Sequence, residues 1–187
     1  RYLTAGETAY IVADSAARAV VSSYAMRELA AGWAALADAQ TPGACPIRLM
    51  VDDTIAGWSS YEEAIAAQPA QQLDEEFLGA TMLYSSGTTG RPKGVIRAQP
   101  QGKPGDGPAR HEPMRSFGFS RDTVYLSPAP LYHAAPLGYS IYTQYLGGTV
   151  VVMDKFDPLE SLRLIEEHRV THSQWVPTMF VRMLKLP

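Results

Sequence analysis

One stretch decides how the chain is interpreted: Tyr84-Ser85-Ser86-Gly87-Thr88-Thr89-Gly90-Arg91-Pro92-Lys93-Gly94-Val95. Four hydroxyl side chains, three glycines and one lysine fall between Ser85 and Gly94, directly after the apolar run 80–84. Glycines let backbone N–H groups turn toward an anion, and hydroxyls and Lys93 add donors and positive charge. A strand that leads into such a loop predicts a polyphosphate site, and therefore ATP binding.

Two better-known phosphate motifs do not fit this stretch. A P-loop requires Gly-x-x-x-x-Gly-Lys-Ser/Thr, whereas here Pro92 precedes Lys93 and Gly94 follows it. The pair Gly87-x-x-Gly90 is not a dinucleotide fingerprint either, because Pro92 and Gly94 discourage the helix that must begin there. The alternative interpretation is a plain connecting loop, which is what most Gly/Ser/Thr/Pro clusters are.

The ordered run Ser-Ser-Gly-Thr-Thr-Gly-x-Pro-Lys-Gly resembles the phosphate loop of the adenylate-forming (AMP-binding) enzymes. This superfamily includes acyl-CoA synthetases, the adenylation domains of peptide synthetases and firefly-type luciferases. The resemblance extends over most of the chain, through the opening run 3–22 and the segments 130–133, 147–153 and 175–178. The stretch 99–113 is the part of the chain that the resemblance does not cover.

The resemblance implies roles for individual residues. The ATP phosphates would be bound by Ser85, Ser86, Gly87, Thr88, Thr89, Gly90 and Lys93. Lys93 would be the catalytic residue, because it offsets charge on the departing pyrophosphate, and Ser85 would give its hydroxyl to Mg²⁺. Tyr132 and His133 would lie beside the carboxylate substrate, where an imidazole or aromatic ring can hydrogen-bond the acid or gate its pocket. Without the resemblance, His133 reads as an ordinary structural histidine.

The implied reaction is an ATP-dependent ligation in two steps. A carboxylate attacks the α-phosphorus of ATP to give an acyl-adenylate, and the thiol of coenzyme A then displaces AMP. The small Ala134 and Ala135 after His133, with Gly138 and Ser140 beyond them, favour a fatty or other bulky acid. Three alternatives stay open: an amino-acid adenylation domain, a luciferase-like enzyme with another acceptor, and a non-catalytic nucleotide-binding module.

The order of strand and helix patterns predicts an α/β fold, with parallel or mixed sheets flanked by helices on both faces. The resemblance makes this part of the large N-terminal domain of an adenylate-forming enzyme. We expect a leading α/β portion at 1–79, the phosphate loop and its strands at 80–98, a mobile insertion at 99–113, and an acyl-pocket α/β portion at 114–187. Within these, the patterns predict helices over 7–15, 24–39, 60–67 and 133–145, another over 157–168, and a last one from Pro177.

The patterns also predict strands over 18–22, 47–51, 93–97, 123–126, 149–153 and 171–176. The helix over 24–39 is expected to bury one face, made of Met26, Leu29, Trp33 and Leu36. Ser60 and Glu63 are expected to form a capping box, and Asp157 is expected to cap the helix that Pro158 begins.

Composition excludes several other classes of protein. The chain has 187 residues, of which 46% are hydrophobic and 19% charged, which is typical of a globular protein. A net charge of −3 argues against a nucleic-acid partner. The single cysteine, Cys45, suits a reducing compartment, and no signal peptide or transmembrane segment is predicted. We therefore expect a cytoplasmic protein. His168 and His172 are expected to be structural, and histidine metal sites are not expected, because no pair has a convincing ligand spacing.

The resemblance also predicts what lies beyond the chain. Family members continue past Pro187 with a motif for the nucleotide and magnesium, a ribose-binding aspartate and a mobile C-terminal domain that carries a second lysine. We expect the present sequence to be an interior piece that lacks the C-terminal domain and is inactive alone. The Pro- and Gly-rich stretch 99–113 is expected to lack regular structure and to be a surface insertion, or alternatively a lid over the nucleotide or acid site.

Overall fold

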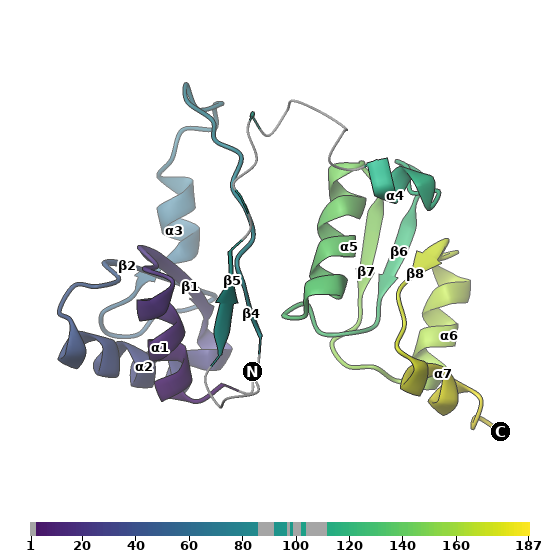
Figure 1. Ribbon diagram of the computed structural model, residues 1–187, viewed down its shortest axis with the longest axis horizontal. Helices are drawn as coiled ribbons and strands as arrows, with labels where there is room; N and C mark the ends of the chain where they lie inside the picture. Colours follow the sequence, from purple (N-terminus) through teal and green to yellow (C-terminus); the bar gives the residue numbers. More distant parts are fainter. Residues whose placement is uncertain (1–2, 86–91, 97, 99–101, 104–111) are drawn as a thin grey trace. The chain divides into compact units, whose positions relative to one another are not determined.

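The computed structural model describes residues 3–85, 92–96, 98, 102–103 and 112–187. The chain divides into two compact units, Arg1–Pro104 and Gly105–Pro187. Both units alternate strands with helices and contain a small parallel sheet (Figure 1). The predicted α/β fold class, with parallel sheets flanked by helices, is therefore confirmed.

The N-terminal unit contains a three-stranded parallel sheet in the order β1-β2-β3. Strands β1 and β2 pair from Ala19↔Ile47 to Ser23↔Val51. The elements before the phosphate loop are α1 (Ala5–Asp14), β1 (Ala19–Ser23), the 3₁₀ turn η1 (Tyr24–Met26), α2 (Arg27–Gln40), β2 (Ile47–Val51), β3 (Ser59–Ser60) and α3 (Tyr61–Ala66).

Side-chain caps fix where two of these helices begin. Thr4 accepts a hydrogen bond from the backbone N–H of Glu7, and Glu7 accepts one from the backbone of Thr4, which makes a complete capping box for α1. The predicted box at Ser60 is half formed. Ser60 accepts from the N–H of Glu63, but it is Glu62 that the Ser60 hydroxyl contacts.

Helix α2 buries Trp33, as the sequence predicted, together with three alanines in place of the other large residues expected on this face. Its buried residues are Ala30, Trp33, Ala34 and Ala37, whereas Leu36, expected on this face, is 41% exposed. Small residues also allow α2 to approach α1 closely. A Cβ added at Gly32 would lie only 3.1 Å from the Cβ of Ala5. Trp33 completes the core, with its ring 5.6 Å from Trp58 in an edge-on arrangement.

The last elements of the N-terminal unit form an antiparallel hairpin, β4 (Leu83–Ser85) with β5 (Lys93–Val95). These are the strands that the sequence predicted on either side of the phosphate loop. Strand β5 ends two residues earlier than expected. In Figure 1 the hairpin runs beside α1.

The C-terminal unit holds a second parallel sheet, in the order β7-β6-β8. Helices α5 and α6 lie on either side of it (Figure 1), as right-handed crossovers in opposite directions require. The central strand β6 is buried over its last three residues, with Leu126 and Ser127 0% exposed. The elements are α4 (Glu112–Ser116), β6 (Val124–Ser127), α5 (Ala134–Tyr145), β7 (Thr149–Val152), α6 (Pro158–Glu167), β8 (His172–Ser173) and α7 (Pro177–Met183).

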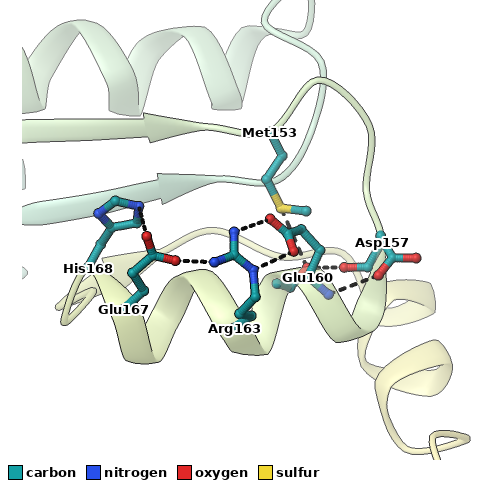
Figure 2. A network of polar contacts seen from close by, with 7 residues as sticks. Met153, Asp157, Glu160, Arg163, Glu167 and His168 are labelled. Carbon is teal, nitrogen blue, oxygen red and sulfur yellow. Dashed lines mark hydrogen bonds and ion pairs between the residues drawn. The ribbon is translucent and has the colours of Figure 1, made fainter.

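Helix α6 begins as the sequence predicted. Asp157 accepts a 2.9 Å hydrogen bond from the N–H of Glu160, and Pro158 occupies the first turn. Figure 2 shows the polar contacts that follow along the helix. The Arg163 guanidinium donates two hydrogen bonds to the Glu160 carboxylate, from Nη2 at 2.6 Å and from Nε at 2.7 Å, and it also contacts Glu167. The Arg163 guanidinium lowers the pKa of Glu160. Because these side chains are about half exposed, the network adds little stability.

Two predictions for this unit need correction. The strand expected over 171–176 is only His172–Ser173, because Ser173 pairs with Leu126 and β6 ends at the next residue. The stretch 99–113 was expected to lack regular structure, yet α4 begins at Glu112. Pro113 is compatible with this helix because the first turn does not need its backbone N–H. Within the described part of the chain, no helix has both the length and the apolar character to cross a bilayer.

Candidate functional site

Ser85 and Lys93 lie opposite each other at the open end of the β4–β5 hairpin. They are direct partners in the register of the two strands, and both are exposed. Side chains of directly paired residues project from the same face of a hairpin. A hydroxyl and an ammonium group therefore emerge together at the point where the connecting residues begin.

Tyr84 and Gly94 form the next pair of the hairpin and occupy its other face. A Cβ added at Gly94 would lie 2.3 Å from the Cε of Met82 and 3.0 Å from the Cζ of Tyr84. A larger residue at this position would force the end of the Met82 side chain to move and would press on the Tyr84 ring. The sequence had suggested a role for Gly94 only as part of the phosphate loop.

The tyrosine hydroxyl ties the hairpin to the first helix. Tyr84 Oη donates to Asp14 Oδ2 at 2.6 Å, and Tyr10 Oη lies 3.4 Å from the other oxygen of the same carboxylate. Burial, together with the adjacent Asp14 carboxylate, raises the pKa of Tyr84 to about 12. No sequence pattern indicated this contact, because Asp14 and Tyr84 are 70 residues apart.

The structure thus brings together two of the predicted phosphate-binding residues, Ser85 and Lys93. The other five lie outside the described residues: Ser86, Gly87, Thr88, Thr89 and Gly90. Their role in binding ATP remains a prediction. The described geometry supports it in one respect, since both ends of the loop are pinned by paired strands.

Tyr132 and His133 lie at the start of α5, a few residues after the end of β6. Both side chains are exposed, Tyr132 at 55%, and their ring centroids are 4.3 Å apart at 49°. The backbone positions this pair: His133 N–H donates to the Pro130 carbonyl at 3.1 Å, and the His133 carbonyl accepts from Leu137 at 3.2 Å. The two exposed rings are therefore presented on a backbone that is fixed by hydrogen bonds.

A cluster of aromatic rings packs against Tyr139 of α5. Phe119 lies 4.3 Å from His172, 5.9 Å from Tyr139 and 6.1 Å from Tyr125, measured between ring centroids. His172 also contacts the Phe117 carbonyl through Nε2 at 3.1 Å and the Thr171 hydroxyl through Nδ1 at 2.8 Å. These contacts agree with the structural role that the sequence analysis gave to His172. The cluster itself was not predicted.

A metal at this site would depend mainly on ligands other than protein side chains. Among the described residues no group of three or more His, Cys, Asp or Glu side chains could hold an ion. The exposed Ser85 hydroxyl is a neutral oxygen donor, which alone binds a divalent cation weakly. Mg²⁺ commonly takes one or two protein ligands and completes its shell with phosphate oxygens and water, so the donor set fits a metal that arrives with a nucleotide.

Comparisons with known proteins agree on one family. The model of the family described as "AMP-binding enzyme" matches residues 2–187. Long-chain-fatty-acid–CoA ligase FadD13 of Mycobacterium tuberculosis is 30% identical over 195 residues, covering 99% of this chain and 35% of that protein. 4-hydroxybutyrate–CoA ligase 2 of Metallosphaera sedula is 38% identical over 109 residues, covering 58% of this chain and 19% of that protein.

A solved structure resembles the whole chain. The inhibitor-bound N-terminal domain of FACL13 from Mycobacterium tuberculosis superimposes with a TM-score of 0.72 at 27% identity, covering 99% of this chain and 44% of that one. The chain therefore spans 35% of FadD13 and 44% of the solved domain.

Proposed function

Because the chain belongs to the AMP-binding enzyme family, we propose that the protein activates a carboxylic acid with ATP and transfers the acyl group to coenzyme A. The membership confirms the resemblance predicted from the sequence. The single observation that carries the proposal is the pairing of Ser85 with Lys93 at the base of the Ser/Thr/Gly loop. The chain lies in the large N-terminal domain of such an enzyme. We propose that it is divided there into the four segments given above, 1–79, 80–98, 99–113 and 114–187.

In the first step, a carboxylate oxygen of the acid bonds to the α-phosphorus of ATP and the bond to the β-phosphate oxygen breaks. The products are an acyl-adenylate and pyrophosphate. Two anions must approach each other, so positioning and charge neutralisation supply most of the catalysis. Lys93, exposed at the hairpin mouth, would place its ammonium group on the departing pyrophosphate.

The loop residues between the paired strands would hold the β- and γ-phosphates. Backbone N–H groups of Gly87 to Gly90 and the hydroxyls of Ser86, Thr88 and Thr89 are the proposed donors. Mg²⁺, when bound with the nucleotide, would neutralise phosphate charge. The Ser85 hydroxyl would be its ligand from this chain.

Tyr132 and His133 would contact the acid. The exposed rings offer an apolar face for the acyl chain, and the imidazole offers a hydrogen bond to the carboxylate. No proton transfer is needed from His133, because a carboxylate is already ionised at neutral pH. In the second step the thiol of coenzyme A attacks the acyl carbon, AMP leaves, and a thioester forms.

The relatives support an acyl-CoA ligase over the other members of the family. One relative is named for long-chain fatty acids and another for 4-hydroxybutyrate. We propose a fatty or other bulky acid as substrate, on the small residues Ala134 and Ala135 that follow His133. We place the reaction in the cytoplasm, where ATP and coenzyme A are available.

Carboxylate-dependent exchange of pyrophosphate into ATP tests the proposal, using the protein encoded by the complete gene. Acetate, aliphatic acids of increasing length, aromatic acids and amino acids are compared, and thioester formation with coenzyme A is then measured for the best acid. We expect exchange with longer or bulkier acids and a coenzyme A product. A folded protein with magnesium that exchanges with no acid contradicts the proposal, and exchange with amino acids alone redirects it to an adenylation domain.

A further inference from the structure

Helix α1 lies far in sequence from the strand that leads into the phosphate loop, but a hydrogen bond between Tyr84 and Asp14 joins it to that strand, β4. We propose that Asp14 and Tyr84 form a positioning pair that holds the β4–β5 hairpin for binding the ATP phosphates. Neither residue is proposed to touch the nucleotide; both act through Ser85 and Lys93. This inference rests on the proposed ATP site and adds α1 to its supporting structure.

The hairpin needs such a support. The described pairing involves three residues on each strand, Leu83↔Val95, Tyr84↔Gly94 and Ser85↔Lys93. An isolated two-stranded hairpin is at best marginally stable in water. The direction in which Ser85 and Lys93 point must therefore be fixed by contacts with the rest of the unit.

Tyr84 is placed to provide this contact. It is the residue next to Ser85, and its ring packs across the strand pair over Gly94, where a Cβ would come within 3.0 Å of its Cζ. Its hydroxyl reaches out of the hairpin to Asp14 Oδ2 at 2.6 Å, the short distance typical of an O–H donor on a carboxylate. A shift of either strand would break the ring contact or the hydrogen bond.

Helix α1, which carries Asp14, is itself fixed in the N-terminal unit. Its residues Ala9 and Val12 belong to the buried core of the N-terminal unit, which includes Trp33 and Met50. A complete capping box fixes its start. Asp14 is its last residue, where the helix dipole disfavours a negative charge, so the donated hydrogen bond also relieves an unfavourable position for the carboxylate.

The test measures MgATP binding by calorimetry in the protein encoded by the complete gene, beside the exchange assay. Tyr84→Phe keeps the ring on Gly94 and removes only the donor, and Asp14→Ala removes the acceptor. Each is expected to raise the Kd for MgATP about fivefold, equivalent to about 1 kcal/mol, and to raise the KM for ATP with kcat within about twofold. The double variant is expected to match the single ones, because both remove the same bond.

Two conservative variants serve as controls. Asp14→Asn keeps an oxygen that can accept from Tyr84, and we expect it to restore most of the affinity. Tyr10→Phe removes the weaker 3.4 Å contact to the same carboxylate and is expected to change the Kd less than Tyr84→Phe does.

The outcomes separate this proposal from the function on which it rests. Wild-type protein that binds MgATP but exchanges no pyrophosphate contradicts the proposed reaction, and the Kd values of the variants still decide the role of the pair. Unchanged Kd in Tyr84→Phe and Asp14→Ala, with lowered melting temperatures, would reduce the pair to a structural contact. Wild-type protein that binds no MgATP overturns both.

Discussion

The β4–β5 hairpin and the β7-β6-β8 sheet carry the two sets of predicted site residues on contrasting structures. The hairpin is antiparallel, short and exposed at its open end, where Ser85 and Lys93 project. The sheet is parallel, and its central strand has Tyr125 at 1% and Leu126 at 0% exposure. The contrast teaches that Tyr132 and His133 follow a strand fixed in a packed core, whereas Ser85 and Lys93, two of the predicted phosphate-binding residues, depend on a few specific contacts to stay in place.

Lys93→Ala should produce the largest change in activity. Loss of a preorganised positive group at developing charge lowers the rate by about 10²–10³-fold in comparable sites, and we expect a drop of this size in acid-dependent exchange. Lys185→Ala, at an exposed lysine of the C-terminal unit, is the matched control and should keep full exchange. Equal rates for Lys93→Ala and wild type would remove Lys93 from the mechanism.

Gly94→Ala should have the next largest effect, because an added side chain would displace the Met82 and Tyr84 side chains that pack over this position. The added Cβ would press on Met82 and the Tyr84 ring and displace Lys93 beside it. We expect the KM for ATP to rise about tenfold, within the range that a displacement of about 1 Å can produce. Gly79→Ala is the control, since a Cβ at Gly79 meets nothing within 4 Å. Similar KM values for the two variants would show that the hairpin tolerates the change.

His133→Ala should weaken binding of the acid without changing binding of the nucleotide. The exposed imidazole can offer one hydrogen bond to the carboxylate, and its loss is expected to raise the KM for the acid about fivefold, the effect of about 1 kcal/mol. The KM for ATP should stay within about twofold. A larger change in the KM for ATP than for the acid would contradict the division of roles between the hairpin and the start of α5.

Asp157→Ala should change stability and nothing at the site. Removing the side chain that caps Glu160 (Figure 2) is expected to lower the free energy of unfolding by about 1 kcal/mol, measured by denaturant titration. Asp157→Asn keeps a capping oxygen and should lie close to wild type. A clear loss of ATP affinity in Asp157→Ala would mean that the stability of the C-terminal unit and nucleotide binding are linked.

Much of the fold could be predicted because the signals are local. The cap at Asp157 with Pro158 and the strand 47–51 depend on neighbours in the sequence, and both were found where predicted. The phosphate loop belongs to the same class of signal, since its hydroxyls, glycines and lysine are consecutive. Local patterns also gave the order of most strands and helices, although β3 and α4 were not predicted and the strand expected over 171–176 ends three residues early.

The remainder could not be predicted because it depends on which distant side chains meet. The contact of Tyr84 with Asp14 spans 70 residues, and the ring of Phe119 meets that of His172 from another element. Leu36 has a helical spacing that suggested burial, yet the alanines of α2 form the packed face. Periodicity tells which face of an element is apolar on average, whereas packing against a particular neighbour decides which residues are covered.

The most direct test of the central claim, that the β4–β5 hairpin binds the ATP phosphates, is the rate at which Lys93 is acetylated with and without MgATP. Lys93 is exposed, so an amine-reactive acetylating reagent should modify it readily in the nucleotide-free protein, and mass spectrometry can follow each lysine separately. With saturating MgATP we predict strong protection of Lys93 and an unchanged rate at Lys185. An equal rate at Lys93 in the presence and absence of MgATP, in protein shown to bind the nucleotide, would contradict the account.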